Sequence, residues 1–417
     1  MILSGYLVLR RATATEVALI AAVVFCLPLF EAPKNVFSAI LLVTWVVQAI
    51  RTRSLGQNSS FDIPILGLAA VLWIAPFFSE FGDNITPLNS APRWTLLALF
   101  VLLASRLEYT KGQVTVILSA LMIGGVTAVI ESFWVWSLNG KPYPEFRSVG
   151  HVNHSSMYSL VTLAVGIGAL YLRQRWLQML GFCAILSTLA FLPPSRSLVG
   201  GVAITAILTV GVSLYAVRRW SVRGLVVATV SMVVVLGGVL ASPPSADLRG
   251  ELVARVSGDD ILSSRDKILN SALAVWDQNP IFGTGWFSFG VATSEEQVRA
   301  ALLEDGKNYS EANYAHLPHG HNLWTTMLIE RGLVGIVSVT ALLFLYFWTF
   351  LPLAMSRDRM KPSDRGVAVA ALLVAVGFTV AGLGNTTMMN EHGHAGMALI
   401  AVAYGYLRGR GLMGNSV

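Results

Sequence analysis

The chain has 417 residues and a formal net charge of +6; 54% of its residues are hydrophobic and only 12% are charged. Soluble domains carry about 25% charged residues, so this composition excludes an ordinary soluble enzyme. No basic tract or nucleic-acid-binding motif is present, and the net charge therefore does not indicate a nucleic-acid partner. Apolar runs of about 18 residues or more recur along the chain, each long enough to cross a hydrocarbon core. The sequence predicts an all-α polytopic membrane protein.

Twelve such runs, taken in chain order, predict membrane-spanning helices. They cover about residues 15–31, 35–50, 62–79, 92–107, 113–137, 155–172, 176–192, 198–217, 223–241, 321–352, 364–384 and 394–408. The tenth run is too long for one straight span and contains Glu330, Arg331 and Gly332, which predict a short helix, a break and then the span. The predicted organisation is residues 1–241 with nine spans, a large loop over residues 242–320 that contains helices, and residues 321–417 with three spans.

Basic residues alternate between the two sides of this layout, as the positive-inside rule requires. With a cytoplasmic N-terminus, every cytoplasmic connection is short and basic, and both termini lie in the cytoplasm. Seven histidines then fall in three outer connections: His151, His154, His316, His319, His321, His392 and His394. If the spans form a bundle, these three connections can converge over one mouth, that is, around a single entrance at the outer end of the bundle.

The stretch "AHLPHGHNLW" gathers three of these histidines just before the tenth run. His319 and His321 precede a helix for which Asn322 is the predicted cap. A histidine at a helix entrance titrates near neutral pH and can act as a general base or acid. Two alternatives stay open at this point: polar loop residues at the water interface, or a metal site in which Glu311 joins His316, His319 and His321.

Two arginines stand near helix ends on the outer side. Arg147 lies in "EFRSVGHVNHSS", ahead of His151 and of the sixth run. Arg196 lies in "LPPSRSLVG", between the seventh and eighth runs. Arginine makes fixed bidentate contacts to phosphate, so both arginines are candidates for binding a phosphate group. The alternative for Arg147 is an interfacial arginine whose side chain reaches lipid headgroups. The alternative for Arg196 is a plain role in a polar turn between two helices.

Arg265 begins an amphipathic stretch inside the large loop. Apolar residues recur after it with helical spacing, at Ile268, Ala272, Leu273 and Trp276. The pair Asn279-Pro280 ends this predicted interfacial helix. The following "FGTGW" predicts a turn, and we expect Trp276 and Trp286 to anchor the segment at the membrane interface. The alternative for these aromatic side chains is stacking on a sugar.

Several common motifs are absent from the sequence. There is no Asp-x-Asp pair, no P-loop, no Ser-His-Asp arrangement and no Gly-x-Ser-x-Gly. The first two absences exclude the usual metal-bound nucleotide-sugar site and an ATP-driven pump. Charged residues are nearly absent from the apolar runs, which argues against an ion or proton relay across the bilayer.

Three stretches, "RSVGHVNH", "RDKILNSALAVWDQNPIFGTGW" and "HNLWTTMLIERGLVG", together resemble the O-antigen ligase and O-antigen polymerase superfamily. In that family pattern an arginine is followed by a tryptophan and by "P-x-x-G-x-G", and a large outer loop ends in "His-Asn…Leu…Glu-x-Gly-x-x-Gly". The resemblance covers about residues 145–335 and the layout of twelve runs. The size of the loop and the short N-terminal spans look more like the ligase.

The resemblance implies a metal-independent, inverting glycosyltransferase of the GT-C fold in the bacterial inner membrane, with a periplasmic site and no cofactor. The implied partners are undecaprenyl-pyrophosphate-linked O-antigen as donor, lipid A–core as acceptor, and membrane lipids. His321, with His319 as the near alternative, matches the family histidine. Arg265 and, after it, Arg147 match the family arginines.

The residue types fit this chemistry. A sugar–pyrophosphate bond breaks more easily when fixed cations meet the charge of the leaving group, which Arg147, Arg265 and Arg196 can supply beside His151. His321 can take or orient the proton of the acceptor hydroxyl. Two alternatives remain: an O-antigen polymerase that uses the same donor, and a transporter or flippase for a lipid-linked solute, which predicts inverted repeats and polar residues at mid-membrane.

Overall fold

The computed structural model describes residues 10–79, 85–139, 144–149, 151–172, 174–189, 204–205, 208, 264–356, 360–388 and 390–413. This part of the chain is almost entirely helical. Its strands are the two-residue segments β1 (Arg10–Arg11) and β2 (Leu107–Glu108), which pair in parallel. The all-α prediction is therefore confirmed for the described residues.

The helices of the described residues fall into two series, one before residue 190 and one after residue 264. The first series is α1 (Ala14–Cys26), α2 (Glu31–Thr52), α3 (Asp62–Ile74) with a 3-10 turn (Ala75–Phe77), α4 (Ile85–Arg106), α5 (Lys111–Asn139), α6 (Val152–Leu170) and α7 (Arg175–Leu189). The second series is α11 (Arg265–Trp276), α12 (Phe289–Ala292), α13 (Glu295–Glu304), α14 (Leu323–Met355), α15 (Pro362–Ala381) and α16 (Asn390–Gly409).

A helix lies at ten of the predicted apolar runs. The other two runs, 198–217 and 223–241, lie outside the described residues apart from 204, 205 and 208. Within the described part, α2, α5, α14 and α15 are long enough and apolar enough to cross a membrane. The chain is thus an integral membrane protein, and the count of twelve spans stays a prediction. Arg196 and residues 242–263 of the large loop also lie outside the described residues.

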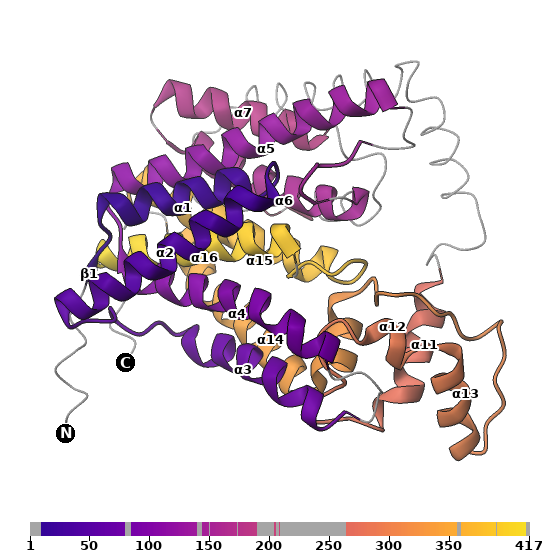
Figure 1. The fold of residues 1–417 in the computed structure, drawn as a ribbon. Coiled ribbons are helices and arrows are strands. Elements are labelled where there is room, and N and C mark those ends of the chain that lie inside the picture. Colours follow the sequence, from indigo (N-terminus) through magenta and orange to yellow (C-terminus); the bar gives the residue numbers. More distant parts are fainter. Residues whose placement is uncertain are drawn as a thin grey trace.

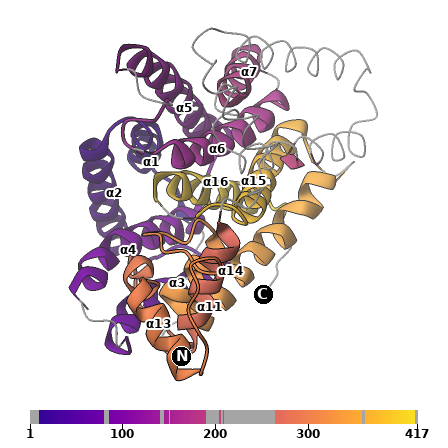
Figure 2. The same ribbon diagram turned by 90° about the vertical axis from the view of Figure 1, so that its right-hand side faces the viewer.

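The helices of the bundle run roughly side by side, with α11, α12 and α13 beyond one end (Figure 1). Figure 2 looks along the bundle and places α15 and α16 at its centre. In the most apolar 18-residue stretch of α15, 89% of the residues are buried, whereas in that of α2 only 6% are buried. The side chains of Val43 and Ile50 on α2 are exposed. A helix that is apolar on its outward face is suited to lipid contact. The central helices pack closely because small residues meet: a Cβ added to Gly168 would lie 2.6 Å from the carbonyl oxygen of Gly366.

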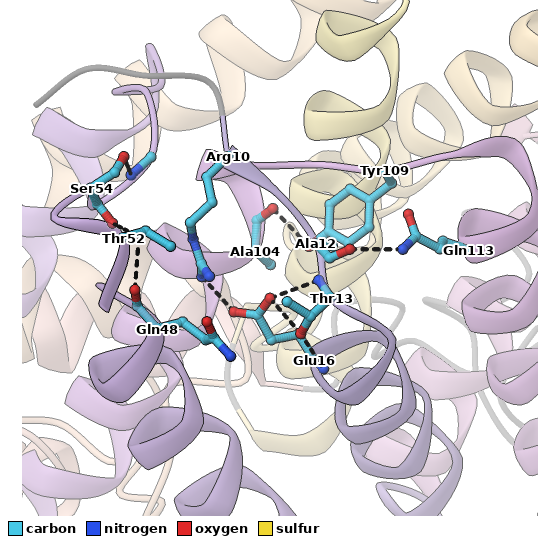
Figure 3. A network of polar contacts seen from close by, with 11 residues as sticks. Arg10, Ala12, Thr13, Glu16, Gln48, Thr52, Ser54, Ala104, Tyr109 and Gln113 are labelled. Carbon is cyan, nitrogen blue, oxygen red and sulfur yellow. Dashed lines mark hydrogen bonds and ion pairs between the residues drawn. The ribbon is translucent and has the colours of Figure 1, made fainter. Parts of the chain in front are cut away.

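β1 and the C-terminus lie at the opposite end of the bundle (Figure 1). Arg10 and Arg106 each form an ion pair in the described residues. Arg10 pairs with Glu16, whose carboxylate also accepts the backbone N–H of Thr13 in a capping box at the start of α1 (Figure 3). Arg106 lies 2.7 Å from the Asp62 carboxylate. Arg10 and Arg106 both belong to the connections that the sequence assigns to the cytoplasmic side, and this assignment stays a prediction.

α14 contains the break that the sequence predicts. Gly332 has φ 57° and ψ −155°, values that interrupt the helix inside the range Leu323–Met355. A Cβ at this glycine would lie 2.4 Å from the carbonyl oxygen of Ile281, so the position needs glycine for its backbone angle and for its space. The break leaves helix N–H and carbonyl groups without intrahelical partners.

The loop that follows α11 satisfies these groups. The N–H of Thr284 donates to the carbonyl of Ile329 at 2.8 Å, and the N–H of Gly285 to that of Glu330 at 3.0 Å. On the other side of the break, the N–H of Leu333 donates to the carbonyl of Pro280 at 2.8 Å. The "FGTGW" turn is therefore confirmed, and its role is to bond the broken helix, which positions the loop against α14.

α11 confirms the predicted amphipathic helix, which ends at Trp276, just ahead of Asn279-Pro280. Its buried face differs from the prediction because Leu273 is 47% exposed. The inward positions pack with α12, α13 and the first part of α14 into a second core that includes Ile268, Ala272, Val275, Phe289, Val298, Leu302 and Ile329. This core carries the segment that leads to His319 and His321.

Candidate active site

The structure brings together histidines from three connections at the end of the bundle nearest α11. His151 caps the start of α6, and its ring lies 5.5 Å from the ring of His154. The ring of His154 lies 5.3 Å from that of His392, at the start of α16. His319 and His321 interact electrostatically with His151. The convergence over one mouth that the sequence predicts is present in the described residues.

His321 is held in a fixed backbone conformation at the entrance of α14. Its φ is 45°, in the left-handed region. The next residue, Asn322, accepts the N–H groups of Trp324 at 2.8 Å and Thr325 at 3.2 Å, so the predicted helix cap is confirmed. The amide of Asn322 donates to the carbonyl of Leu383 at 3.0 Å. The segment that carries His321 is thereby tied to the end of α15.

Arg265 reaches the same connection from α11. Its Nη2 donates to the carbonyl oxygen of Gly384 at 3.1 Å. Arg265 and Asn322 thus donate to the carbonyl oxygens of two successive residues in the α15–α16 connection. Burial lowers the pKa of His321, and the positive charge of Arg265 lowers that pKa further. The imidazole of His321 is therefore neutral at neutral pH, as a proton acceptor must be.

His319 is exposed and lies beside an aromatic side chain. Its ring centroid is 6.5 Å from that of Phe287, in an edge-to-face arrangement. Partial loss of surrounding water lowers the pKa of His319, and His151 lowers it further. His319 thus lies next to the site, with a weaker constraint on its position than His321 has.

His392 and His154 also belong to this cluster, although the sequence assigned neither of them a role in catalysis or in substrate binding. The Nε2–H of His392 donates to the carbonyl of Thr386 at 2.8 Å, because a carbonyl can only accept. The Nδ1 of His392 is buried and has no hydrogen-bond partner among the described residues. The one signal in the sequence was that all the histidines lie on one predicted side.

Arg147 stands apart from this cluster. Its side chain is 74% exposed, and its Nη1 lies 3.7 Å from the Glu131 carboxylate of α5. The expected grouping of Arg147 with Arg265 is therefore not formed through a direct contact in the structure. An exposed ion pair of this kind is worth about 0–1 kcal/mol, so Arg147 can leave Glu131 at little cost.

His316 has a structural environment. Its Nδ1–H donates to the carbonyl of Thr293 at 2.7 Å, and its Nε2 accepts the hydroxyl of Tyr309 at 2.8 Å. Both ring nitrogens are engaged, so a metal ion bound to either nitrogen of His316 would displace the hydrogen bond at that nitrogen. No group of three or more His, Cys, Asp or Glu side chains is placed to hold a metal ion in the described part of the chain.

Trp286 is buried rather than placed at the membrane interface, which makes the expectation of an interfacial anchor wrong for this residue. It is 5% exposed, and the guanidinium carbon of Arg331 lies 4.7 Å from the centre of its ring. The same guanidinium lies 4.4 Å from the centre of the Trp94 ring. Arg331 is fully buried, and its charge faces two aromatic rings. Sequence reasoning missed this arrangement because it depends on contacts between distant segments.

Residues 194–340 match the sequence profile of a family described as O-antigen ligase. The matched region contains Arg196, Arg265, His319 and His321, whereas Arg147 and His151 precede it. The match confirms the resemblance found in the sequence over this part of the chain. The comparison with curated proteins gave no match.

Proposed function

From the family match and the geometry around His321, we propose that the protein is an O-antigen ligase of the bacterial inner membrane. It transfers O-antigen polysaccharide from undecaprenyl pyrophosphate to lipid A–core at the periplasmic face. In this proposal the chain has about twelve spans in a GT-C fold, over residues 1–241 and 321–417, and both termini are cytoplasmic. Residues 242–320 form the periplasmic loop, to which α11, α12 and α13 belong.

The observation that carries the proposal is the position of His321 at the entrance of α14, where it interacts electrostatically with Arg265, His319 and His151. Its ring is neutral, because burial and Arg265 both lower its pKa. A neutral imidazole can accept the proton of the acceptor sugar hydroxyl as that oxygen attacks the anomeric carbon. His319 is the near alternative for this role, and its own pKa is also lowered.

Arg265 supplies the cation for the leaving pyrophosphate. It is the first residue of α11, where the positive end of the helix dipole adds to the guanidinium charge. The fork of an arginine can meet two phosphate oxygens at once. We assign Arg147, Arg196 and His151 as further pyrophosphate contacts. Arg147 is suited to this role because its exposed pair with Glu131 is cheap to break.

The reaction proposed is a single displacement without a metal ion. The acceptor oxygen forms a bond to the anomeric carbon, and the bond from that carbon to the pyrophosphate oxygen breaks. Direct displacement inverts the configuration at this carbon. The proton of the hydroxyl passes to His321, and the charge left on undecaprenyl pyrophosphate is met by the arginines.

A transfer assay tests the proposal. Purified protein is mixed with lipid-pyrophosphate-linked glycan and lipid A–core in EDTA, for the wild type and for His321→Asn. Asparagine accepts a left-handed backbone conformation, so this variant removes the imidazole while keeping the local fold. A lipopolysaccharide ladder in the wild type alone supports the ligase. Longer lipid-linked glycan without a ladder supports the polymerase instead, and no change in either glycan contradicts both.

A further inference from the structure

A cavity of about 270 Å³ lies beside the histidine cluster, between α1, α2, α4, the start of α16 and the loop that carries Trp286. Two of its lining residues connect it to the candidate active site. Glu391 immediately precedes His392, and Phe287 packs against His319. The mechanism proposed above uses neither of these lining residues, so the cavity is a separate feature at the edge of the site.

Two buried indole N–H groups in the cavity lining lack an acceptor. Trp94 is 2% exposed and Trp286 is 5% exposed. Neither indole nitrogen has a hydrogen-bond partner within the described residues. The guanidinium of Arg331 lies against both rings and holds them in place. A buried donor without an acceptor is costly, and a bound hydroxyl group would satisfy it.

The charged groups of the cavity disfavour an anionic ligand. Lys34 is 6% exposed, and its ammonium lies 2.5 Å from the Glu31 carboxylate and also contacts Glu391. Two carboxylates therefore face one ammonium, and the lining has no excess positive charge to attract phosphate. The cavity is in this respect unlike the surroundings of Arg265.

The lining also offers acceptors for hydroxyl groups. The carboxylates of Glu31 and Glu391 accept hydrogen bonds. The Nδ1–H of His394 donates to the carbonyl of Asn390 at 2.7 Å, so the Nε2 of a neutral His394 is an acceptor. Sugar hydroxyls both donate and accept, and the apolar faces of a pyranose ring suit aromatic walls. The donors, acceptors and rings of this cavity match that pattern.

We propose that this cavity binds one uncharged sugar residue of a polysaccharide substrate, with the indole N–H groups of Trp94 and Trp286 as donors and Glu391 as acceptor. The assignment to a transferase substrate rests on the proposed function. The binding of a sugar in the cavity does not rest on the proposed function, because it can be measured without any transfer reaction.

The test is a titration of the purified full-length protein with glucose, galactose and N-acetylglucosamine, followed by isothermal calorimetry. Saturable binding of at least one sugar is expected for the wild type. Trp286→Phe keeps the ring against Arg331 but removes the N–H, and it should weaken that binding about fivefold, which corresponds to one lost neutral hydrogen bond. Trp94→Phe and Glu391→Gln should weaken it similarly.

Trp348→Phe is the matched control, because Trp348 is 71% exposed on α14 and is not part of the cavity lining. Its sugar affinity should equal that of the wild type. Inorganic phosphate is the competing probe. No saturable binding of any of the three sugars, unchanged affinity in all three cavity variants, or displacement of the sugar by phosphate would overturn the proposal.

The source of the sugar follows from transfer kinetics with Trp286→Phe. A raised KM for the lipid-linked glycan identifies the donor as the ligand, and a raised KM for lipid A–core identifies the acceptor. Sugar binding without any transfer activity keeps the cavity proposal and contradicts the ligase. Transfer activity without sugar binding supports the ligase and contradicts the cavity proposal.

Discussion

The Nη2 of Arg265 donates to the carbonyl oxygen of Gly384 at 3.1 Å, which joins the start of α11 to the connection between α15 and α16. Asn322 donates to Leu383 in the same connection at 3.0 Å. One short connection thus fixes the distance between the proposed phosphate-binding arginine and the helix entrance that presents His321. The site is assembled from segments far apart in the sequence, and the α15–α16 connection is their common support.

Replacing Arg265 by lysine should lower kcat by about 100-fold, the typical cost of removing one fixed donor to a developing charge. Lysine keeps the charge but loses the planar fork. Arg299→Lys is the matched control, because Arg299 is a 52% exposed arginine of α13 paired with Glu295. The measurement is the initial rate of transfer at saturating donor. Equal rates in the two variants would show that Arg265 has no role in the reaction.

The transfer rate should stay constant through neutral pH and fall in acid. His321 must be neutral to accept a proton, and its pKa lies below its ordinary value because of burial and Arg265. Protonation therefore inactivates the enzyme only as the pH falls through that lowered pKa. Arg265→Gln removes a charge that lowers the pKa of His321, so the acidic limb should move to higher pH. The pH profile of kcat/KM checks the wild type, and an NMR titration of His321 checks the variant.

Gly332→Ala should destabilise the protein by about 2 kcal/mol or more, through strain at a positive φ and a clash with the carbonyl of Ile281. Gly112→Ala is the control, since a Cβ at Gly112 meets nothing within 4 Å. Thermal unfolding in detergent compares the two variants. If Gly332→Ala unfolds at the same temperature as Gly112→Ala, the break in α14 does not need glycine.

The helices and the break in α14 could be predicted because they follow from local patterns. Apolar runs of sufficient length predict helices, and Gly332 beside two charged residues predicts an interruption. The cap by Asn322 is also local, since it involves only the residues that follow. These features depend on few residues that are close in sequence.

The parts that could not be predicted depend on contacts between distant segments. The periodicity of α11 placed Leu273 on its apolar face, but the packing of α13 and α14 against the other side decides which residues are buried. Arg331 sits between Trp94 and Trp286, which lie on two other segments. Arg147 turns to Glu131 rather than towards Arg265. No local sequence pattern predicts which face of α11 is buried, which rings Arg331 contacts or which carboxylate Arg147 pairs with.

The two hydrogen-bonding roles of Asn322 can be separated by substitution. Asn322→Ala removes the cap of α14 and the bond to Leu383, and should cost about 1 kcal/mol of stability together with a large loss of transfer rate. Asn322→Asp still accepts the N–H groups of Trp324 and Thr325, and its charge suits a helix start. An ionised aspartate cannot donate to Leu383.

Asn322→Asp should therefore unfold near the wild-type temperature and still transfer slowly, because His321 loses its tie to the α15–α16 connection. Thermal unfolding and the transfer rate, measured on the same preparations, decide the matter. A rate that simply follows stability across both variants would mean that the bond to Leu383 does not position His321. A slow but stable Asn322→Asp would show that the reaction needs the entrance of α14 fixed to this connection, beyond what folding requires.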